Sequence, residues 1–226
     1  GADEDALIAH CEAIAGRIPL IGFYLQPAVG GIVLSRGFWQ RFAAIDNVIA
    51  IKVAPFNRYR TLDVVHGVVA AEAEDRVSLY TGNDDHILLD LLTPFTARRA
   101  GEDVVVRFRG GLLGHWSVWV KPAVDYLAQA HAAVAAGAVD AELLQLDSQI
   151  TDANGALFDV LNDFSGCIAG CHEVLRRQGL LQGTWCLNPD EAMSPGQTEA
   201  LDRVIADYPH LCDDDFVAEN LQRWLA

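Results

Sequence analysis

A strand followed by a helix recurs four times in the first 136 residues, and this repeat limits the folds that the chain can adopt. Each strand is a nearly continuous apolar run, and successive strands begin about 28 residues apart. The expected strands are 20–25, 48–53, 77–80 and 104–113, and the expected helices after them are 34–44, 61–73, 85–92 and 118–136. Apolar strands alternating with helices are typical of a parallel sheet covered by helices. The sequence therefore predicts an α/β protein.

Beyond residue 137 the pattern becomes purely helical. The expected helices cover about 139–164, 166–178, 195–207 and 214–225. Four strands are too few to close a barrel, and a complete (β/α)8 barrel typically takes about 250 residues. On the repeat alone, the strands form either an open doubly wound sheet or one half of a barrel.

The net charge restricts the partners. The formal charge is −15, whereas nucleic acids and anionic membranes are bound by clustered Lys and Arg. No apolar stretch reaches about 18 residues, and no basic region followed by an apolar run opens the sequence. Five cysteines are an odd number for a disulfide framework and suit a reducing compartment. We therefore expect a cytoplasmic protein that binds small molecules and neither nucleic acid nor membrane.

Lys52 lies inside the apolar run of the second expected strand. It is one of only two lysines among 16 basic residues, so lysine is not the usual surface cation of this chain. Burial can lower the pKa of a lysine from about 10.4 toward roughly 7. The resulting neutral amine can attack a ketone or an aldehyde and form a Schiff base. The alternative is a lysine whose stem packs on the strand while its ammonium group reaches water.

Tyr24 lies near the end of the first expected strand, as Lys52 does in the second. Barrel enzymes place their chemistry at the carboxyl ends of strands, and neighbouring strands lie about 4.8 Å apart. We therefore expect both side chains to enter one pocket, where a phenol relays protons during imine formation. The alternative is a packed tyrosine with a hydrogen-bonded hydroxyl. Side chains on opposite faces of the sheet would argue against both the barrel and the Schiff-base site.

Four short motifs follow one another along the expected strands. They are Phe23-Tyr24-Leu25-Gln26-Pro27 with Gly31, Ile51-Lys52-Val53-Ala54, Thr81-Gly82-Asn83-Asp84-Asp85, and Gly110-Gly111-Leu112-Leu113. Their order, and the 28 residues from Tyr24 to Lys52, resemble the dihydrodipicolinate synthase and N-acetylneuraminate lyase family, the pyruvate-type Schiff-base aldolases. The resemblance covers residues 18 to 122, and the helical tail resembles the helices that follow the barrel of this family.

The resemblance implies a (β/α)8 TIM barrel. Residues 1–136 would be its second half, with strands five to eight, and residues 137–226 would be a helical extension packed on the barrel. The family's first four strands, with the Gly-Thr-Thr segment that holds the oxo-acid carboxylate, are absent from this sequence. The resemblance therefore also implies an N-terminal half-barrel as a partner, and a homo-oligomer.

The resemblance also implies a carbon–carbon or carbon–oxygen lyase that uses no cofactor and no metal. Lys52 would form the imine with a 2-oxo acid, and Tyr24 would be the proton relay. Gly82 and Leu113 would line the pocket. The other open functions are a ligand-binding or non-catalytic relative of the family, and a half-barrel that is completed by another half-barrel chain, because an isolated half leaves unpaired strand edges.

Further polar residues are candidates for substrate contact. Val29 stands where the lysine-pathway synthases carry an arginine, and Arg58 is our substitute for binding the carboxylate, because a guanidinium matches carboxylate geometry. Asn83 either contacts a polar substrate or caps the next helix. His115 either titrates near neutral pH and binds a phosphate or hydroxyl group, or is a packed or solvent-facing histidine. For Cys167-x-x-x-Cys171-His172 we predict core packing, since no second ligand pair for a metal follows.

Overall fold

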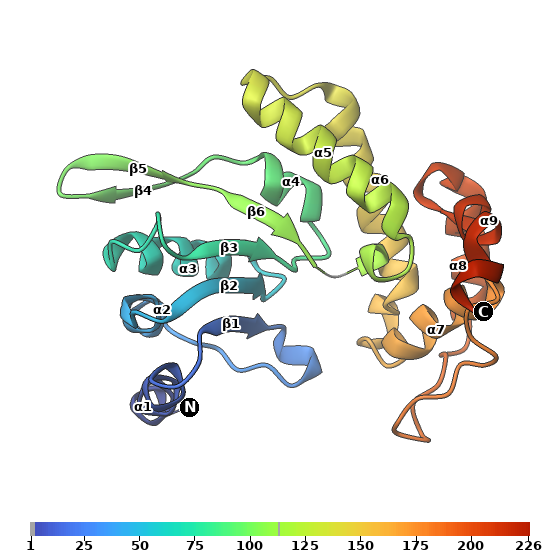
Figure 1. Cartoon of the computed structure of the whole chain (residues 1–226), viewed down its shortest axis with the longest axis horizontal. Helices are drawn as coiled ribbons and strands as arrows, with labels where there is room; N and C mark the ends of the chain where they lie inside the picture. The colour runs from blue at the N-terminus through green and yellow to red at the C-terminus, as the bar shows by residue number, and fades with distance from the viewer. Residues whose placement is uncertain (1–2, 113) are drawn as a thin grey trace. The chain divides into compact units, whose positions relative to one another are not determined.

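A four-stranded parallel sheet is the centre of the computed structural model, which describes residues 3–112 and 114–226. The strands are β1 (Leu20–Leu25), β2 (Val48–Ala54), β3 (Ser78–Thr81) and β6 (Phe108–Gly111). They lie side by side in that order, and each pairing is parallel (Figure 1). The predicted α/β class with a parallel sheet is confirmed. Within the described residues the sheet is open and does not close into a barrel.

Short polar caps set where the helices around this sheet begin. The helices are α1 (Glu4–Ala15), α2 (Arg36–Ala44), α3 (Arg58–Ala70) and α4 (Ile87–Leu92). Asp3, Ser35 and Asn57 each accept a backbone hydrogen bond from the first turn of α1, α2 and α3. Such bonds satisfy N–H groups that have no partner within the helix.

An antiparallel hairpin precedes β6, where the sequence predicted one strand over 104–113. Its strands are β4 (Phe95–Arg99) and β5 (Glu102–Val106) (Figure 1). Ala100 and Gly101 form the turn with φ of 53° and 90°, the left-handed pair that a tight hairpin turn requires. The single-strand prediction was wrong because an apolar run indicates extended backbone but not its partner. The first part of that run pairs with β4, and only the second part joins the parallel sheet.

One face of the sheet is buried beneath helices. On this face a Cβ at Gly22 would lie 2.5 Å from the ring of Phe42 in α2, and Tyr24 packs on Trp39 of the same helix. The strand residues that share this face are almost completely buried: Ile51, Val53, Leu79, Thr81 and Phe108. The apolar core of the sheet therefore lies between the strands and these helices.

The opposite face of the sheet carries exposed apolar side chains. Ile21 is 65%, Phe23 48% and Leu112 56% exposed. An exposed apolar patch of this kind marks a surface that a ligand or another chain segment covers. We call this side the open face.

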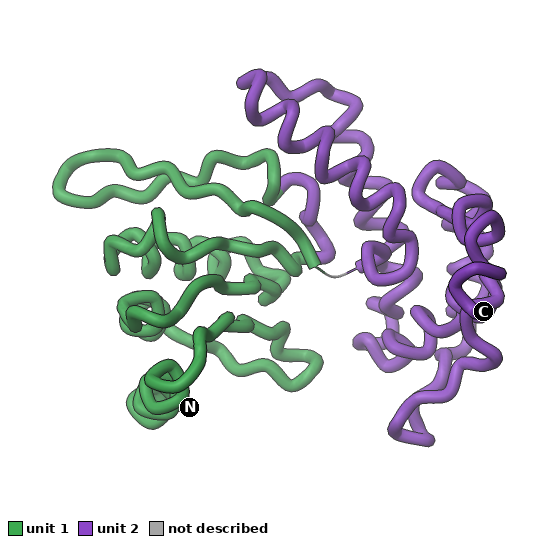
Figure 2. Tube along the Cα trace, in the orientation of Figure 1, with its two compact units in different colours: residues 1–83, 90–112 green, residues 84–89, 113–226 purple. Residues whose placement is uncertain are grey.

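Two compact units divide the chain (Figure 2): Gly1–Asn83 with Asp90–Leu112, and Asp84–Leu89 with Leu113–Ala226. The second unit holds α5 (Val120–Ala136), α6 (Ala141–Leu157), α7 (Cys167–Arg177), α8 (Gln197–Asp207) and α9 (Asp214–Trp224). Helices were predicted at each of these places, although α6 ends well before residue 164. The predicted domain boundary at residues 136 and 137 stays a prediction. Across the described part of the chain, no helix combines the length and the apolar character needed to cross a bilayer.

Candidate functional site

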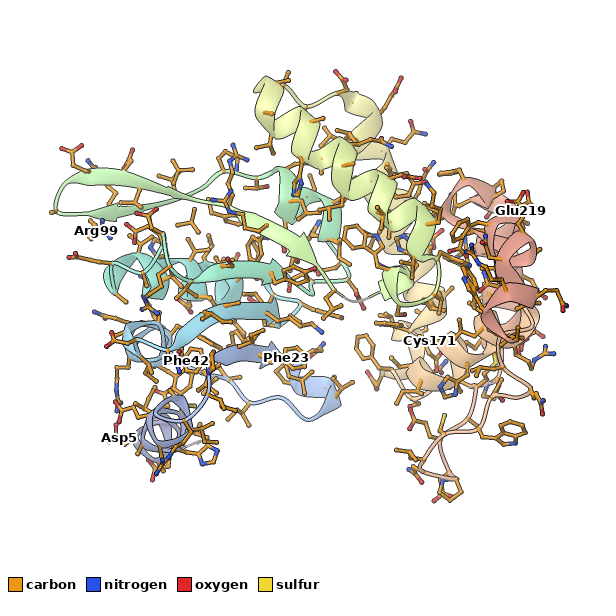
Figure 3. All side chains as sticks on the ribbon, viewed as in Figure 1. Asp5, Phe23, Phe42, Arg99, Cys171 and Glu219 are labelled. Atoms are coloured by element: carbon orange, nitrogen blue, oxygen red, sulfur yellow. The ribbon has the colours of Figure 1, made fainter. Side chains whose placement is uncertain are left out.

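Lys52 lies on the open face near the carboxyl end of β2. Its Nζ is 4.3 Å from the ring centroid of Phe23, the register partner of Lys52 on β1. Phe23 is labelled on that strand in Figure 3. An aromatic ring attracts an ammonium group held over its face. The lysine side chain is half-buried. The amine therefore combines an apolar setting with access from solvent.

Gly82 lies against the stem of Lys52. A Cβ at Gly82 would be 2.8 Å from Lys52 Cε and 2.8 Å from the Cβ of Ala54. A glycine, which has no side chain, permits such a close approach of a neighbouring group. The structure thus brings Gly82 and Lys52 together, whereas the lining of a substrate pocket by Gly82 stays a prediction. Leu113, the other predicted lining residue, lies outside the described residues.

Tyr24 points to the face opposite Lys52. Its register partner on β2 is Val53, and its ring centroid lies 4.8 Å from that of Trp39. Its hydroxyl accepts a hydrogen bond from the Leu34 N–H at 3.3 Å and donates one to the Leu34 carbonyl at 3.4 Å. The expected convergence of Tyr24 and Lys52 is therefore wrong in this structure, and by the criterion set from the sequence this counts against the barrel and against a Schiff-base site built on these two residues. Successive side chains of a strand leave on opposite faces, so the register alone decides which one accompanies Lys52.

Arg58 and Asn83 belong to a buried polar network. The fully buried carboxylate of Asp90 pairs with the Arg58 guanidinium and accepts hydrogen bonds from the Thr81 hydroxyl at 2.6 Å and the Asn83 amide at 2.9 Å. The Asn83 Oδ1 accepts the Phe56 N–H at 3.1 Å. Arg58 thus already holds a carboxylate, and Asn83 neither caps a helix nor faces solvent. The predicted substrate contacts of both residues find no support in this geometry.

The Asp90 network ties together two loops that follow strands. Asn83 is the second residue after β3, and Phe56 lies in the loop between β2 and α3. Phe56 has a φ of 48°, in the left-handed region that is unfavourable for a bulky side chain. The hydrogen bond from Phe56 to Asn83 helps to hold that conformation. The network therefore determines the shape of the loop that directly follows the Lys52 strand.

His115 is completely buried in the second unit. Asn154 donates its amide N–H to the Asp84 carbonyl, so its Oδ1 accepts both the His115 backbone N–H at 2.7 Å and the ring Nδ1–H at 3.0 Å. The ring Nε2 is buried with no hydrogen-bond partner among the described residues. Burial lowers the pKa of His115 to about 4. Of the two alternatives for His115, this geometry supports the packed histidine, because a charged imidazole would lose its hydration in this interior.

We expect the second unit to lose stability as the pH falls from about 6.5 to about 4. In this range the unfolded chain binds a proton at His115 and the folded chain does not. The lowered pKa contributes about 3 kcal/mol to the free energy of unfolding, and this contribution is fully present above pH 6.5 and lost by pH 4. Urea unfolding at several pH values measures the free energy of unfolding, and hydrogen exchange in α5 and α6 follows the second unit. In the His115→Leu variant the free energy of unfolding should depend less steeply on pH in this range. An unchanged pH dependence would contradict its assignment to His115.

The two cysteines of α7 are half-buried free thiols. Burial raises the pKa of Cys167 to about 12 and that of Cys171 to about 11. The Cys171 Sγ lies 3.5 Å from the Ser117 hydroxyl. Both cysteines are therefore protonated at neutral pH and poor nucleophiles. Among the residues that the structure describes, no three His, Cys, Asp or Glu side chains gather into a set that could hold a metal ion.

Tyr80 is the residue of the open face that the sequence did not single out. It is the register partner of Lys52 on β3, and its side chain is half-buried. The available signal was its place at the end of an expected strand, directly before the Thr81-Gly82 motif. Without the strand register, Tyr80 and Tyr24 were equally able to face Lys52.

Comparison with known proteins places this fold. No protein-family model and no curated protein matches the sequence. Among solved structures, the chloride-inhibited dihydrodipicolinate synthase from Acinetobacter baumannii complexed with pyruvate is similar at a TM-score of 0.67 and 21% identity, over 92% of this chain and 62% of that one. A monomeric dihydrodipicolinate synthase variant is similar at a TM-score of 0.62 and 20% identity, over 91% of this chain and 61% of that one. The predicted resemblance to dihydrodipicolinate synthases is therefore confirmed at the level of the fold, and this chain spans about three fifths of their length.

Proposed function

We propose that this chain carries the imine-forming lysine of an aldolase or lyase that acts on a 2-oxo acid. The observation that supports the proposal is the position of Lys52. It stands on the open face, at the carboxyl end of a parallel strand, beside Phe23 and Gly82. Ligands of such folds bind at the carboxyl ends of the strands. The similarity to a synthase that was crystallised with pyruvate makes a small oxo acid the first compound to test.

The proposed architecture is the second half of a (β/α)8 barrel. In it, β1, β2, β3 and β6 are strands five to eight, residues 1–136 form the half-barrel, and residues 137–226 form the helical extension. The apolar side chains of the open face, and the free edges of β1 and β6 in the four-stranded sheet, support an N-terminal half-barrel that completes the structure. Assembly as a cytoplasmic homo-oligomer belongs to the same proposal.

Trapping with borohydride tests the imine directly. The protein is incubated with pyruvate and sodium borohydride, and the intact mass and the peptide map are measured. Reduction of an imine leaves a stable secondary amine, so we expect one oxo-acid adduct on the peptide that contains Lys52. An adduct on Lys121 alone, or none with a broad set of 2-oxo acids and aldehydes, would overturn the proposal.

A second candidate is a ligand-binding relative of the family that does no chemistry. The observation in its favour is Tyr24, the predicted proton relay, which lies on the other face and is bound to Leu34. Such a protein binds pyruvate without an adduct. Saturable pyruvate binding in calorimetry, together with a negative borohydride experiment, would decide for this candidate.

We expect Gly82→Ala to slow imine formation at Lys52 by roughly 10-fold. The added Cβ overlaps both the Lys52 stem and the fixed Cβ of Ala54, so the amine must move, and overpacking of this kind costs about 1–3 kcal/mol. The rate of borohydride-trapped adduct measures the effect. Gly16→Ala is the matched control, because its added Cβ comes no closer than 3.6 Å to any atom beyond its two neighbours in the chain. Equal adduct rates in both variants would contradict the placement of Gly82 beside the amine.

A further inference from the structure

The open face carries one row of four register partners across the sheet. From β1 to β6 these are Phe23, Lys52, Tyr80 and Gly110. Register partners in a parallel sheet project to the same side. Lys52 therefore stands between two aromatic side chains, and one of these carries a hydroxyl group.

Two glycines give this row its shape. The Lys52 stem crosses Gly82 of the β3 strand end, and the Tyr80 ring crosses Gly110 of β6. A Cβ at Gly110 would lie 2.3 Å from the ring of Tyr80 and 3.0 Å from its hydroxyl oxygen. The two glycines thus leave space over the strands that the Lys52 stem and the Tyr80 ring occupy on the open face.

We propose that Tyr80, and not Tyr24, is the phenol that transfers protons in the chemistry of Lys52. The inference rests on the proposed imine function and assigns a further catalytic residue to it. Tyr24 is excluded by its position, since it is 1% exposed and its hydroxyl is engaged with Leu34. Tyr80 shares the face of Lys52, sits on the adjacent strand, and is partly accessible.

The proton transfers balance with one phenol. The amine lone pair forms the C–N bond while the carbonyl π electrons move to oxygen; Tyr80 gives its proton to that oxygen and takes one from the nitrogen. The product is a neutral carbinolamine, and the phenol is regenerated. In the second step the nitrogen lone pair forms the C=N bond, the C–O bond breaks, and Tyr80 protonates the leaving oxygen, which departs as water. The phenolate then removes the remaining nitrogen proton, so amine and ketone have become imine and water.

A matched pair of variants tests the assignment. Tyr80→Phe and Tyr24→Phe each remove one hydroxyl and keep the ring. With pyruvate and borohydride, we expect Tyr80→Phe to form the Lys52 adduct roughly 100-fold more slowly than the wild type, the size typical of a lost general acid or base. Tyr24→Phe should retain the rate within about twofold, since it removes only the hydrogen bonds with Leu34 on the buried face.

A chemical rescue separates proton transfer from a structural role. Imidazole buffer should restore part of the rate in Tyr80→Phe, because a dissolved acid replaces the phenol, and should leave the wild type unchanged. Gly110→Ala displaces the ring of residue 80. It should strongly reduce the rate of adduct formation when Tyr80 is present, and reduce it little when it is combined with Tyr80→Phe.

Different outcomes refute different claims. If the wild type gives the adduct and Tyr80→Phe matches its rate, or Tyr24→Phe is equally slow, the role of Tyr80 is overturned and the imine function stands. If the wild type gives no adduct on Lys52, the imine function is overturned, and the role of Tyr80 with it.

Discussion

Replacing Lys52 by Arg should reduce the trapped oxo-acid adduct to background, by roughly 10³-fold or more, since removal of a covalent nucleophile costs other enzymes up to about 10⁶. Arg keeps a positive charge and can remain over the ring of Phe23. It cannot deprotonate to a nucleophilic amine at neutral pH. The variant therefore removes the chemistry and preserves the electrostatics of the open face.

Lys121→Arg is the matched control for this experiment. Lys121 is the only other lysine of the chain, is exposed, and pairs with Asp125 on α5. The control should form the adduct at the wild-type rate. The assignment of Lys52 would be falsified if Lys52→Arg still gave an adduct that mapped to a single internal site.

Replacing Asp90 by Ala should destabilise the first unit, which holds the four-stranded sheet, by about 3 kcal/mol. Asp90 is completely buried and satisfies the Arg58 guanidinium, the Thr81 hydroxyl and the Asn83 amide. Removing one partner of a buried ion pair costs about 3–5 kcal/mol. The lower end is expected here because Arg58 is 36% exposed and regains water when its partner is lost. The two polar donors that remain buried keep the cost well above that of a surface pair.

Asp63→Ala is the control for Asp90→Ala. Asp63 pairs with Arg36 near the surface, and pairs of that kind contribute about 0–1 kcal/mol. Urea-dependent hydrogen exchange in β2 and β3 measures the stability of the first unit separately from that of the second. Equal losses of stability in Asp90→Ala and Asp63→Ala would show that the Asp90 network does not stabilise the loops at the carboxyl ends of the strands.

The strands and helices of this chain followed from local patterns. The apolar runs at 20–25 and 48–53, and the polar caps of the helices, depend on neighbouring residues only, and the structure has these elements within a few positions. The order of the motifs along the chain was enough to indicate the fold of the dihydrodipicolinate synthases. The hairpin of β4 and β5 was missed because its second strand and β6 form one apolar run in the sequence.

The site was predicted less well than the fold, and the reason is geometric. Lys52 was recognisable because a lysine in an apolar strand is unusual in any register. The phenol beside it was not, because a shift of one residue moves a strand side chain to the other face. The pairing of Phe23 with Lys52 turns Tyr24 toward Trp39 and leaves Tyr80 on the open face. Arg58 was unavailable for a substrate because Asp90, 32 residues later in the sequence, folds back against it.

By itself, the sequence determined which segments are strands and helices, their order, and the presence of one unusual lysine, because these depend on residue types and on their spacing along the chain. Only the tertiary structure decided which side chains share a face with that lysine and which carboxylate neutralises Arg58. Strand register and long-range ion pairs depend on contacts between residues that are distant in sequence, and no local pattern encodes them.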